Sequence, residues 1–170
     1  MIYDGDRSIA TWDAAKGNGN GVIDVSEQGA FGATIIRNPD NLTWSQDGSL
    51  YVQEDRSVAS GYFAQQEASI FKVSAKAKDP ITGQAASERW LQIDRTSVPT
   101  VYGQSDANPA DDGNWESSGI IDVSAIYGET AGSLFLADVQ AHNLTNGNIG
   151  GNGYLVQGGQ LNLIQNPALF

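Results

Sequence analysis

Two adjacent carboxylates followed by an arginine make the most suggestive short run in the sequence, Gln53-Glu54-Asp55-Arg56. The run follows a segment typical of a β-strand, and neighbouring side chains of a strand point to opposite faces. One of Glu54 and Asp55 could therefore face a cavity while the other is solvated or caps a turn. Hard cations bind several carboxylate oxygens, and Arg56 could hold a phosphate or carboxylate with two donors. A charged strand exit without further function is the alternative.

A second candidate region joins an aspartate to the single histidine of the chain. Asp138 stands within an apolar run, and His142 follows four residues later. An aspartate in such a run costs free energy unless it is paired or bound to a cation. His142 could be a metal ligand, a general acid or base, or a histidine held by structural hydrogen bonds. With one histidine and no cysteine, a tetrahedral zinc site is not expected.

The third candidate region surrounds Glu116, which borders an expected strand ending at Asp122. Either carboxylate could bind a metal, although Asp122 could instead cap the short helix expected after it. Ser117 and Ser118 lack the sequence of a nucleophile elbow, so a serine nucleophile is not expected.

A Gly/Asn-rich segment, residues 16–27, matches much of a twelve-residue calcium loop. Oxygen donors occupy its third, fifth, ninth and twelfth positions, and Gly21 occupies the sixth, where the loop turns sharply. These donors are Asn18, Asn20, Asp24 and Glu27. Lys16 stands at the first position, where aspartate is needed and where a cation repels Ca²⁺, and Asp13 lies three residues too early. A Gly/Asn turn before a short helix is the alternative.

The scaffold that positions these residues is expected to be built from short strands. Glycine makes up 20 of 170 residues and clusters with Asn, Asp, Ser and Pro between short apolar runs. Asp47-Gly48 predicts a hairpin over residues 42–53, and Gly158-Gly159 predicts a second two-residue turn. Short helices are expected at 24–31 and 122–127. Further strands are expected at 69–73, 89–93, 120–123, 133–138, 154–157 and 160–164.

This pattern predicts a single all-β domain over residues 1–170. A four-stranded propeller blade takes roughly 40–50 residues. Eight or nine strands therefore correspond to about two to three blades, which indicates a partial β-propeller with long Gly/Asn-rich loops. A β-sandwich is the alternative. The edges of a partial propeller are open, so the chain is expected to form homo-oligomers or to associate through these edges.

Charge and composition exclude several classes of partner. The formal net charge is −11, so nucleic acid and anionic membrane surfaces would repel the chain. No apolar run approaches the ~18 residues of a membrane span, and cysteine is absent. All nine Lys and Arg residues lie at or before Arg95, whereas seven acidic residues follow it. These late carboxylates must be solvated or satisfied by backbone donors, by earlier arginines or by metal cations.

Six phrases of the sequence, in order, resemble the PhoX-like bacterial alkaline phosphatases. They run from about residue 35 to residue 164. The phrases are Asn38-Pro39-Asp40-Asn41-Leu42-Thr43-Trp44 with Asp47-Gly48-Ser49-Leu50-Tyr51-Val52-Gln53-Glu54-Asp55-Arg56-Ser57, then Glu67-Ala68-Ser69-Ile70-Phe71-Lys72, Asn114-Trp115-Glu116-Ser117-Ser118-Gly119-Ile120-Ile121-Asp122-Val123, Asp138-Val139-Gln140-Ala141-His142 and Leu155-Val156-Gln157-Gly158-Gly159-Gln160-Leu161.

The resemblance implies the C-terminal portion of a larger exported β-propeller, located outside the cell or in the periplasm. Members of the family are phosphomonoesterases that use calcium, and in some cases iron, at the propeller centre. A small phosphate ester is the implied substrate. The resemblance implies metal-binding roles for Glu54, Asp55, Glu116, Asp138, Asp40 and Asn41, and catalytic roles for Arg56 and His142. The chain departs from some relatives because it lacks a cysteine ligand, and residues 16–27 lie outside the shared pattern.

Three functions stay open at this point. Metal-dependent phosphomonoester hydrolysis suits an acidic chain, because cations must intervene between carboxylates and a phosphate dianion. A partial propeller supplies only some ligands, so we expect the parent protein to be active and the isolated chain to be inactive. A non-catalytic, calcium-binding exported β module is the second hypothesis, and a lactonase-like or esterase-like propeller is the third.

Overall fold

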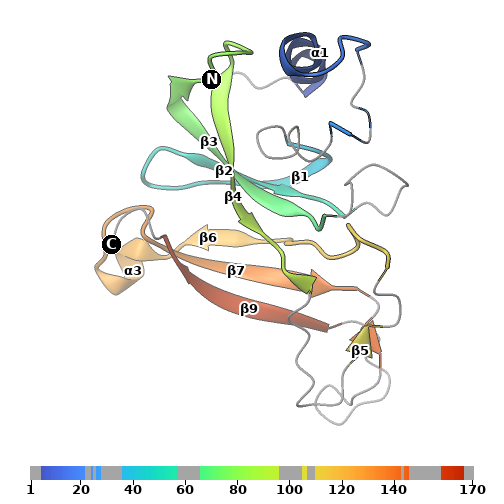
Figure 1. Cartoon of the computed structure of the whole chain (residues 1–170). Coiled ribbons are helices and arrows are strands. Elements are labelled where there is room, and N and C mark those ends of the chain that lie inside the picture. Colours follow the sequence, from blue (N-terminus) through green and yellow to red (C-terminus); the bar gives the residue numbers. More distant parts are fainter. Residues whose placement is uncertain are drawn as a thin grey trace.

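The computed structural model describes residues 5–21, 24, 26–27, 36–56, 66–95, 105–106, 110–142, 144–145 and 158–166, with the backbone alone at 5–9, 105–106 and 144–145 (Figure 1). Nine strands and two helices lie in this part of the chain. They are α1 (Gly5–Lys16), β1 (Pro39–Trp44), β2 (Leu50–Glu54), β3 (Ser69–Lys78), β4 (Ala85–Gln92), β5 (Ser105–Asp106), β6 (Ile120–Asp122), α3 (Ser124–Tyr127), β7 (Leu134–Ala141), β8 (Leu144–Thr145) and β9 (Gly158–Gln165).

The strands form two larger antiparallel sheets, which confirms the prediction of a mostly β fold. The first sheet has the order β1-β2-β3-β4 and the second the order β6-β7-β9, while β5 and β8 form a short pair. Figure 1 shows α1 beyond the four-stranded sheet, on the side away from β6-β7-β9. Neither larger sheet closes into a ring within the described residues. An arrangement of two packed sheets is common to propeller blades and sandwiches.

The hairpin predicted at Asp47-Gly48 is confirmed. Gly48 has a φ of 84°, in the left-handed region that favours glycine. The Gly48 amide donates to the Ser45 carbonyl over 3.0 Å, and the Ser45 amide donates to the Ser49 carbonyl over 2.9 Å. The turn therefore fixes the register of β1 against β2, with Trp44 opposite Leu50 and Thr43 opposite Tyr51.

An aromatic cluster lies between the two larger sheets. The ring centroids of Tyr51 and Phe135 are 4.7 Å apart, and the Trp90 ring lies 5.0 Å from each of them. Ile70 of β3 and Ile120 of β6 are buried in the same cluster. Such contacts pack one sheet on the other, because aromatic rings bury large apolar surfaces and prefer tilted or edge-to-face pairs.

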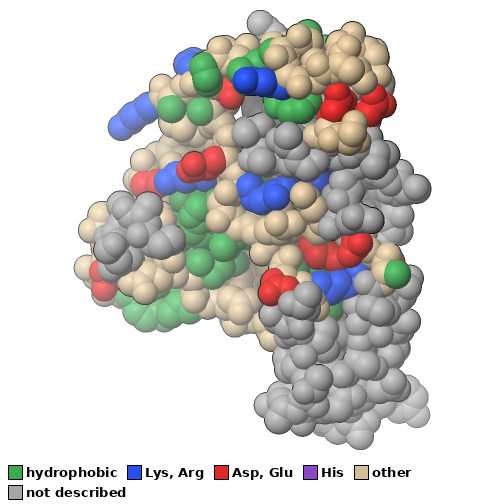
Figure 2. All heavy atoms as spheres, in the orientation of Figure 1, with side chains coloured by type: hydrophobic (Ala, Val, Ile, Leu, Met, Phe, Trp, Pro, Cys, Tyr) green, Lys and Arg blue, Asp and Glu red, His purple; other side chains and the backbone are tan. Residues whose placement is uncertain are grey.

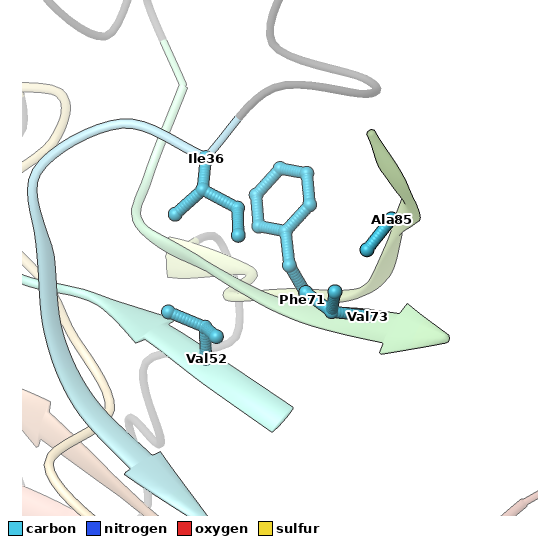
Figure 3. Close-up of a cluster of buried hydrophobic side chains, with 5 residues drawn as sticks. All are labelled: Ile36, Val52, Phe71, Val73 and Ala85. Carbon is cyan, nitrogen blue, oxygen red and sulfur yellow. The ribbon is translucent and has the colours of Figure 1, made fainter. Parts of the chain in front are cut away.

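The opposite face of the four-stranded sheet is also buried. Figure 3 shows Ile36, Val52, Phe71, Val73 and Ala85 directed toward one another on this face. Because Tyr51 and Val52 are adjacent in β2, they point to opposite sides of the sheet and each enters a different core. The centre of the four-stranded sheet is therefore packed on both faces, whereas most of β1 and the end of β3 are exposed.

A carboxylate joins the two sheets at the hairpin turn. Asp122 Oδ2 accepts hydrogen bonds from the Ser45 hydroxyl over 2.6 Å and from the Gln46 amide over 3.2 Å. Oδ2 also accepts from the Gly132 amide, and Oδ1 accepts from the Ser124 amide. These hydrogen bonds hold the pKa of Asp122 below its ordinary value, although its partial burial opposes this effect. Asp122 therefore acts as a structural link at the start of α3.

One prediction needs correction, and two fall wholly or mostly outside the described residues. The prediction of a turn at Gly158-Gly159 is wrong, because both glycines lie in β9 opposite Ala141 and Gln140. A Cβ at Gly159 would stand 2.8 Å from the Val139 carbonyl oxygen, so glycine permits close strand approach there. Helix α1 was not expected, whereas α3 agrees with the helix expected near 122–127. The strand at 154–157 and most of the helix at 24–31 fall outside the described residues.

The surface carries mixed charge, and no described helix could span a bilayer. Figure 2 shows acidic and basic side chains near one another on the face in view. Over the part of the chain that the structure describes, no helix has the length and apolar character of a membrane span.

Candidate metal and phosphate site

The end of β2 sends alternate side chains to the two faces of its sheet, the alternation that the sequence predicted for Glu54 and Asp55. Gln53 Nε2 donates to Ser117 Oγ over 2.6 Å, toward the three-stranded sheet. Glu54 points the other way, toward Arg37. Gln53 and Glu54 are both buried, with exposed fractions of 1% and 0%. The strand therefore delivers polar groups to two separate sites.

Glu54 is fully engaged by protein donors. Its Oε1 accepts from the Arg37 amide and Nε over 2.7 and 3.0 Å, and its Oε2 accepts from Arg37 Nη2 and the Ser69 amide over 2.9 and 3.0 Å. Burial raises the pKa of Glu54, and Arg37 offsets part of this effect. Four donors match the acceptor capacity of a carboxylate. The metal role of Glu54 stays a prediction, but this geometry favours a structural ion pair.

Asp138 shows how an aspartate is accommodated in an apolar strand. Its Oδ1 accepts from the amides of Ser118 and Gly119 over 2.9 and 2.7 Å, and from Ser117 Oγ over 3.4 Å. Backbone donors therefore satisfy one oxygen of the carboxylate, as buried polar groups require. Its other oxygen accepts no hydrogen bond within the described residues.

Four polar residues lie together where β2 approaches the second sheet. We call them the charged cluster: Glu116, His142, Asp55 and Arg56. Glu116 Oε1 lies 3.0 Å from His142 Nε2, and Glu116 Oε2 accepts from the Arg56 amide over 2.7 Å. Glu116 is held in place by a β-bridge to Gln140. The structure thus brings together four of the residues singled out in the sequence, although they come from three separate segments.

The electrostatics of the charged cluster centre on two carboxyl groups that share one site. Burial raises the pKa of Glu116, and the neighbouring Asp55 carboxyl raises it further through a hydrogen bond and like charge. The Arg56 amide and His142 oppose this rise. Two carboxylates so close cannot both ionise freely unless a proton or a cation lies between them. The cluster can therefore take up either.

This pKa shift predicts a pH-dependent loss of stability that Glu116→Gln should reduce. Because the folded-state pKa is raised, ionisation of Glu116 costs stability as pH rises from its ordinary value near 4.5 through the raised value. We therefore expect the melting temperature of the wild type to fall, relative to that of Glu116→Gln, as pH rises from 4 to 7. Thermal unfolding at several pH values measures the two slopes. Parallel slopes would contradict the prediction.

The remaining two predicted ligands of this region lie at an edge strand. Asp40 Oδ2 accepts from Asn41 Nδ2 over 2.7 Å, within the irregular start of β1. No hydrogen bond or ion pair in the described part of the chain joins either residue to the charged cluster. Their metal role stays a prediction.

A second group of oxygen donors surrounds the loop after α1. Asp13 is 1% exposed, and its two oxygens accept from the amides of Gly19 and Gly21 over 3.1 and 2.6 Å. A Cβ added at Gly17 would lie 2.2 Å from Asp13 Oδ1 and 2.6 Å from Glu27 Oε1. The two carboxylates therefore converge on Gly17, where only glycine fits.

The four donors predicted for this loop also come together. Asp24 Oδ2 accepts from Nδ2 of Asn18 and of Asn20 over 2.5 and 3.0 Å. Glu27 Oε1 accepts from the backbone amide of Asn18 over 2.7 Å. The spacing of a twelve-residue calcium loop leaves Asp13 three residues outside it. The loop nevertheless folds so that Asp13 joins the donors, and the run of glycines at 17, 19 and 21 was the available signal.

Within the described ranges, no group of three or more His, Cys, Asp or Glu side chains has the arrangement of a metal site. Calcium also binds Asn side chains and backbone carbonyls. The donor set of residues 13–27 is of this mixed kind, so its chemistry fits calcium better than a transition metal.

Comparison of the chain with protein-family models, with curated proteins and with solved structures finds no match. The functional argument therefore depends on the residues of the charged cluster and of the loop at 13–27.

Proposed function

We propose that the chain is part of a metal-dependent phosphomonoesterase, with the charged cluster as its contribution to the active site. The observation that carries the proposal is the close pair of carboxyl groups, Asp55 and Glu116, next to the exposed side chain of Arg56. A carboxyl pair attracts a cation, and a guanidinium attracts a phosphate oxygen. The resemblance of the sequence phrases to phosphomonoesterases supports the same reaction.

The roles of the residues follow from their chemistry. Asp55 and Glu116 would supply two carboxylates to calcium, with iron as a further candidate, and the remaining ligands would come from outside the described residues. A bound cation supplies charge neutralisation and an acidified water. Arg56 would bind the phosphate ester, and His142 would donate or accept a proton, with Glu116 Oε1 fixing its Nε2 over 3.0 Å.

The proposal includes a larger architecture. The two antiparallel sheets would be consecutive blades of an incomplete propeller in an exported protein, extracellular or periplasmic. The outer strands of the described sheets, such as β1 and β9, are where further strands or a second copy would associate. Other blades would then supply the ligands that the charged cluster lacks.

The test is hydrolysis of para-nitrophenyl phosphate by this chain and by a longer protein that contains it, with calcium, with iron and with a chelator. We expect chelator-sensitive hydrolysis by the longer protein and its loss in Glu116→Gln. Glu129→Gln removes one acidic charge at an exposed site and serves as the matched control. Absence of hydrolysis in both proteins under both metals would refute the proposal, and selective lactone hydrolysis would favour a lactonase.

A non-catalytic calcium-binding module is the second candidate. The convergence of Asp13 and Glu27 on Gly17 favours it. Calcium binding without phosphatase activity in either protein would support this candidate over the first.

A further inference from the structure

Among the arginines with described side chains, Arg56 is the exposed one, and its partner is neutral. The structure describes four arginine side chains. Arg37 pairs with Glu54 over 2.9 Å, and Arg95 pairs with Glu67 over 3.1 Å and with Asp111. Arg89 donates to two neutral glutamines and is partly buried. Arg56 is exposed, and its Nη1 donates to a neutral acceptor, the side-chain carbonyl of Asn114, over 2.6 Å.

Asn114 is itself held firmly. It is 1% exposed, and its Nδ2 donates to Asp111 Oδ2 over 2.9 Å. Because Asp111 can only accept when ionised, it orients the Asn114 amide so that the oxygen faces Arg56. Arg95 pairs with Asp111 in turn. The guanidinium therefore contacts the end of a buried polar chain, while the Arg56 amide is fixed by Glu116.

We propose that Asn114 is a positioning residue that holds the Arg56 guanidinium ready for a phosphate oxygen. This inference rests on the proposed function, and it assigns to Asn114 the positioning of the group that binds the phosphate. Within the described residues, Nε and Nη2 of Arg56 donate no hydrogen bond, so two donor groups stay available for a phosphate oxygen. A neutral acceptor fixes the side chain without cancelling its charge, whereas a carboxylate at the same place would form an ion pair with it.

The charge argument predicts an unusual order among substitutions of Asn114. Asn114→Asp preserves the shape but places a carboxylate against Arg56, and we expect phosphate binding to weaken by about tenfold or more. Asn114→Ala removes the acceptor but leaves the charge, so we expect a smaller loss, roughly threefold. Because Asn114→Asp also places its carboxylate beside Asp111, a structural defect would appear as a lower melting temperature, and the dependence on Arg56 separates the two causes.

Gln66→Glu is the matched control. Gln66 Oε1 accepts from Arg89 Nη2 over 2.7 Å, so this change also converts a neutral acceptor of an arginine into a carboxylate and alters net charge equally. Titration calorimetry with inorganic phosphate, in calcium-containing buffer, measures binding to the whole chain and its variants. We expect Gln66→Glu to bind phosphate as the wild type does.

A double-mutant cycle keeps the test decisive if Asn114→Asp does not fold. If Asn114 acts through Arg56, then Asn114→Ala should cost nothing further in an Arg56→Gln background. Equal binding by the wild type and the Asn114 variants, equal weakening by Gln66→Glu, or an additive cycle would each overturn the positioning role but leave the proposed function intact. Absence of phosphate binding by the wild-type chain, together with absence of hydrolysis by both this chain and the longer protein, would overturn both.

Discussion

Replacing Arg37 by alanine is expected to lower the free energy of unfolding by about 3–5 kcal/mol at neutral pH, because the change leaves a buried carboxylate without its cation. Glu54 has an exposed fraction of 0% and receives three of its four hydrogen bonds from Arg37. One of these comes from the backbone and would persist in the variant. The melting temperature should fall by roughly 6–20 °C. Urea unfolding followed by circular dichroism measures the loss.

The pH dependence and a paired substitution check the cause of this loss. Without the Arg37 charge, burial raises the pKa of Glu54 still further, so the deficit should be smallest at low pH and should grow as pH rises. The double variant Arg37→Met with Glu54→Leu should recover much of the stability, because it leaves no unpaired charge. A loss below about 1 kcal/mol in Arg37→Ala would show that the pair is unimportant to the fold.

Substituting Asp13 by asparagine is expected to weaken calcium binding by about 100-fold, which corresponds to roughly 2.7 kcal/mol. Asp13 brings a buried carboxylate to the loop, where it converges with Glu27. Removing its charge leaves the size of the side chain almost unchanged. Titration calorimetry with calcium chloride measures the affinity directly.

Glu129→Gln is the control for the calcium measurement, because it removes one exposed negative charge far along the chain from residues 13–27. It should leave the affinity within a factor of about two, since exposed charges are strongly screened. Equal affinity in wild type and Asp13→Asn would exclude Asp13 as a ligand. A wild type that binds no calcium would refute the calcium loop altogether.

Local signals in the sequence predicted much of the sheet structure. Asp47-Gly48 specified its hairpin because a tight turn needs a residue that accepts positive φ, and Gly48 has it. Gly158-Gly159 carries the same local signal, but there glycine serves the close approach of β9 to Val139. The sequence shows that glycine is needed at both places. Only the strand pairing shows whether the glycine serves a tight turn or a close approach of two strands.

The site was predictable in its parts but not in its grouping. Strand alternation indicated that Glu54 and Asp55 would separate, and they do. It could not show that Glu54 meets Arg37, because that contact joins two residues 17 positions apart. Asn114 gave no signal of its own, since an asparagine in a Gly/Asp-rich stretch is typical of a turn. Its role depends on a contact with Arg56 across 58 positions.

The three-stranded sheet is built wholly from the half of the chain that has no lysine or arginine, beyond Arg95. Trypsin therefore has no cleavage site in it, whether folded or unfolded. All tryptic cuts fall in the half that carries α1 and the four-stranded sheet. After a cut at Arg95, only non-covalent contacts hold the two halves together, among them the hydrogen bonds of Asp122 with Ser45 and Gln46. Co-migration of the fragments thus reports the strength of packing between the sheets, separately from the stability of either sheet.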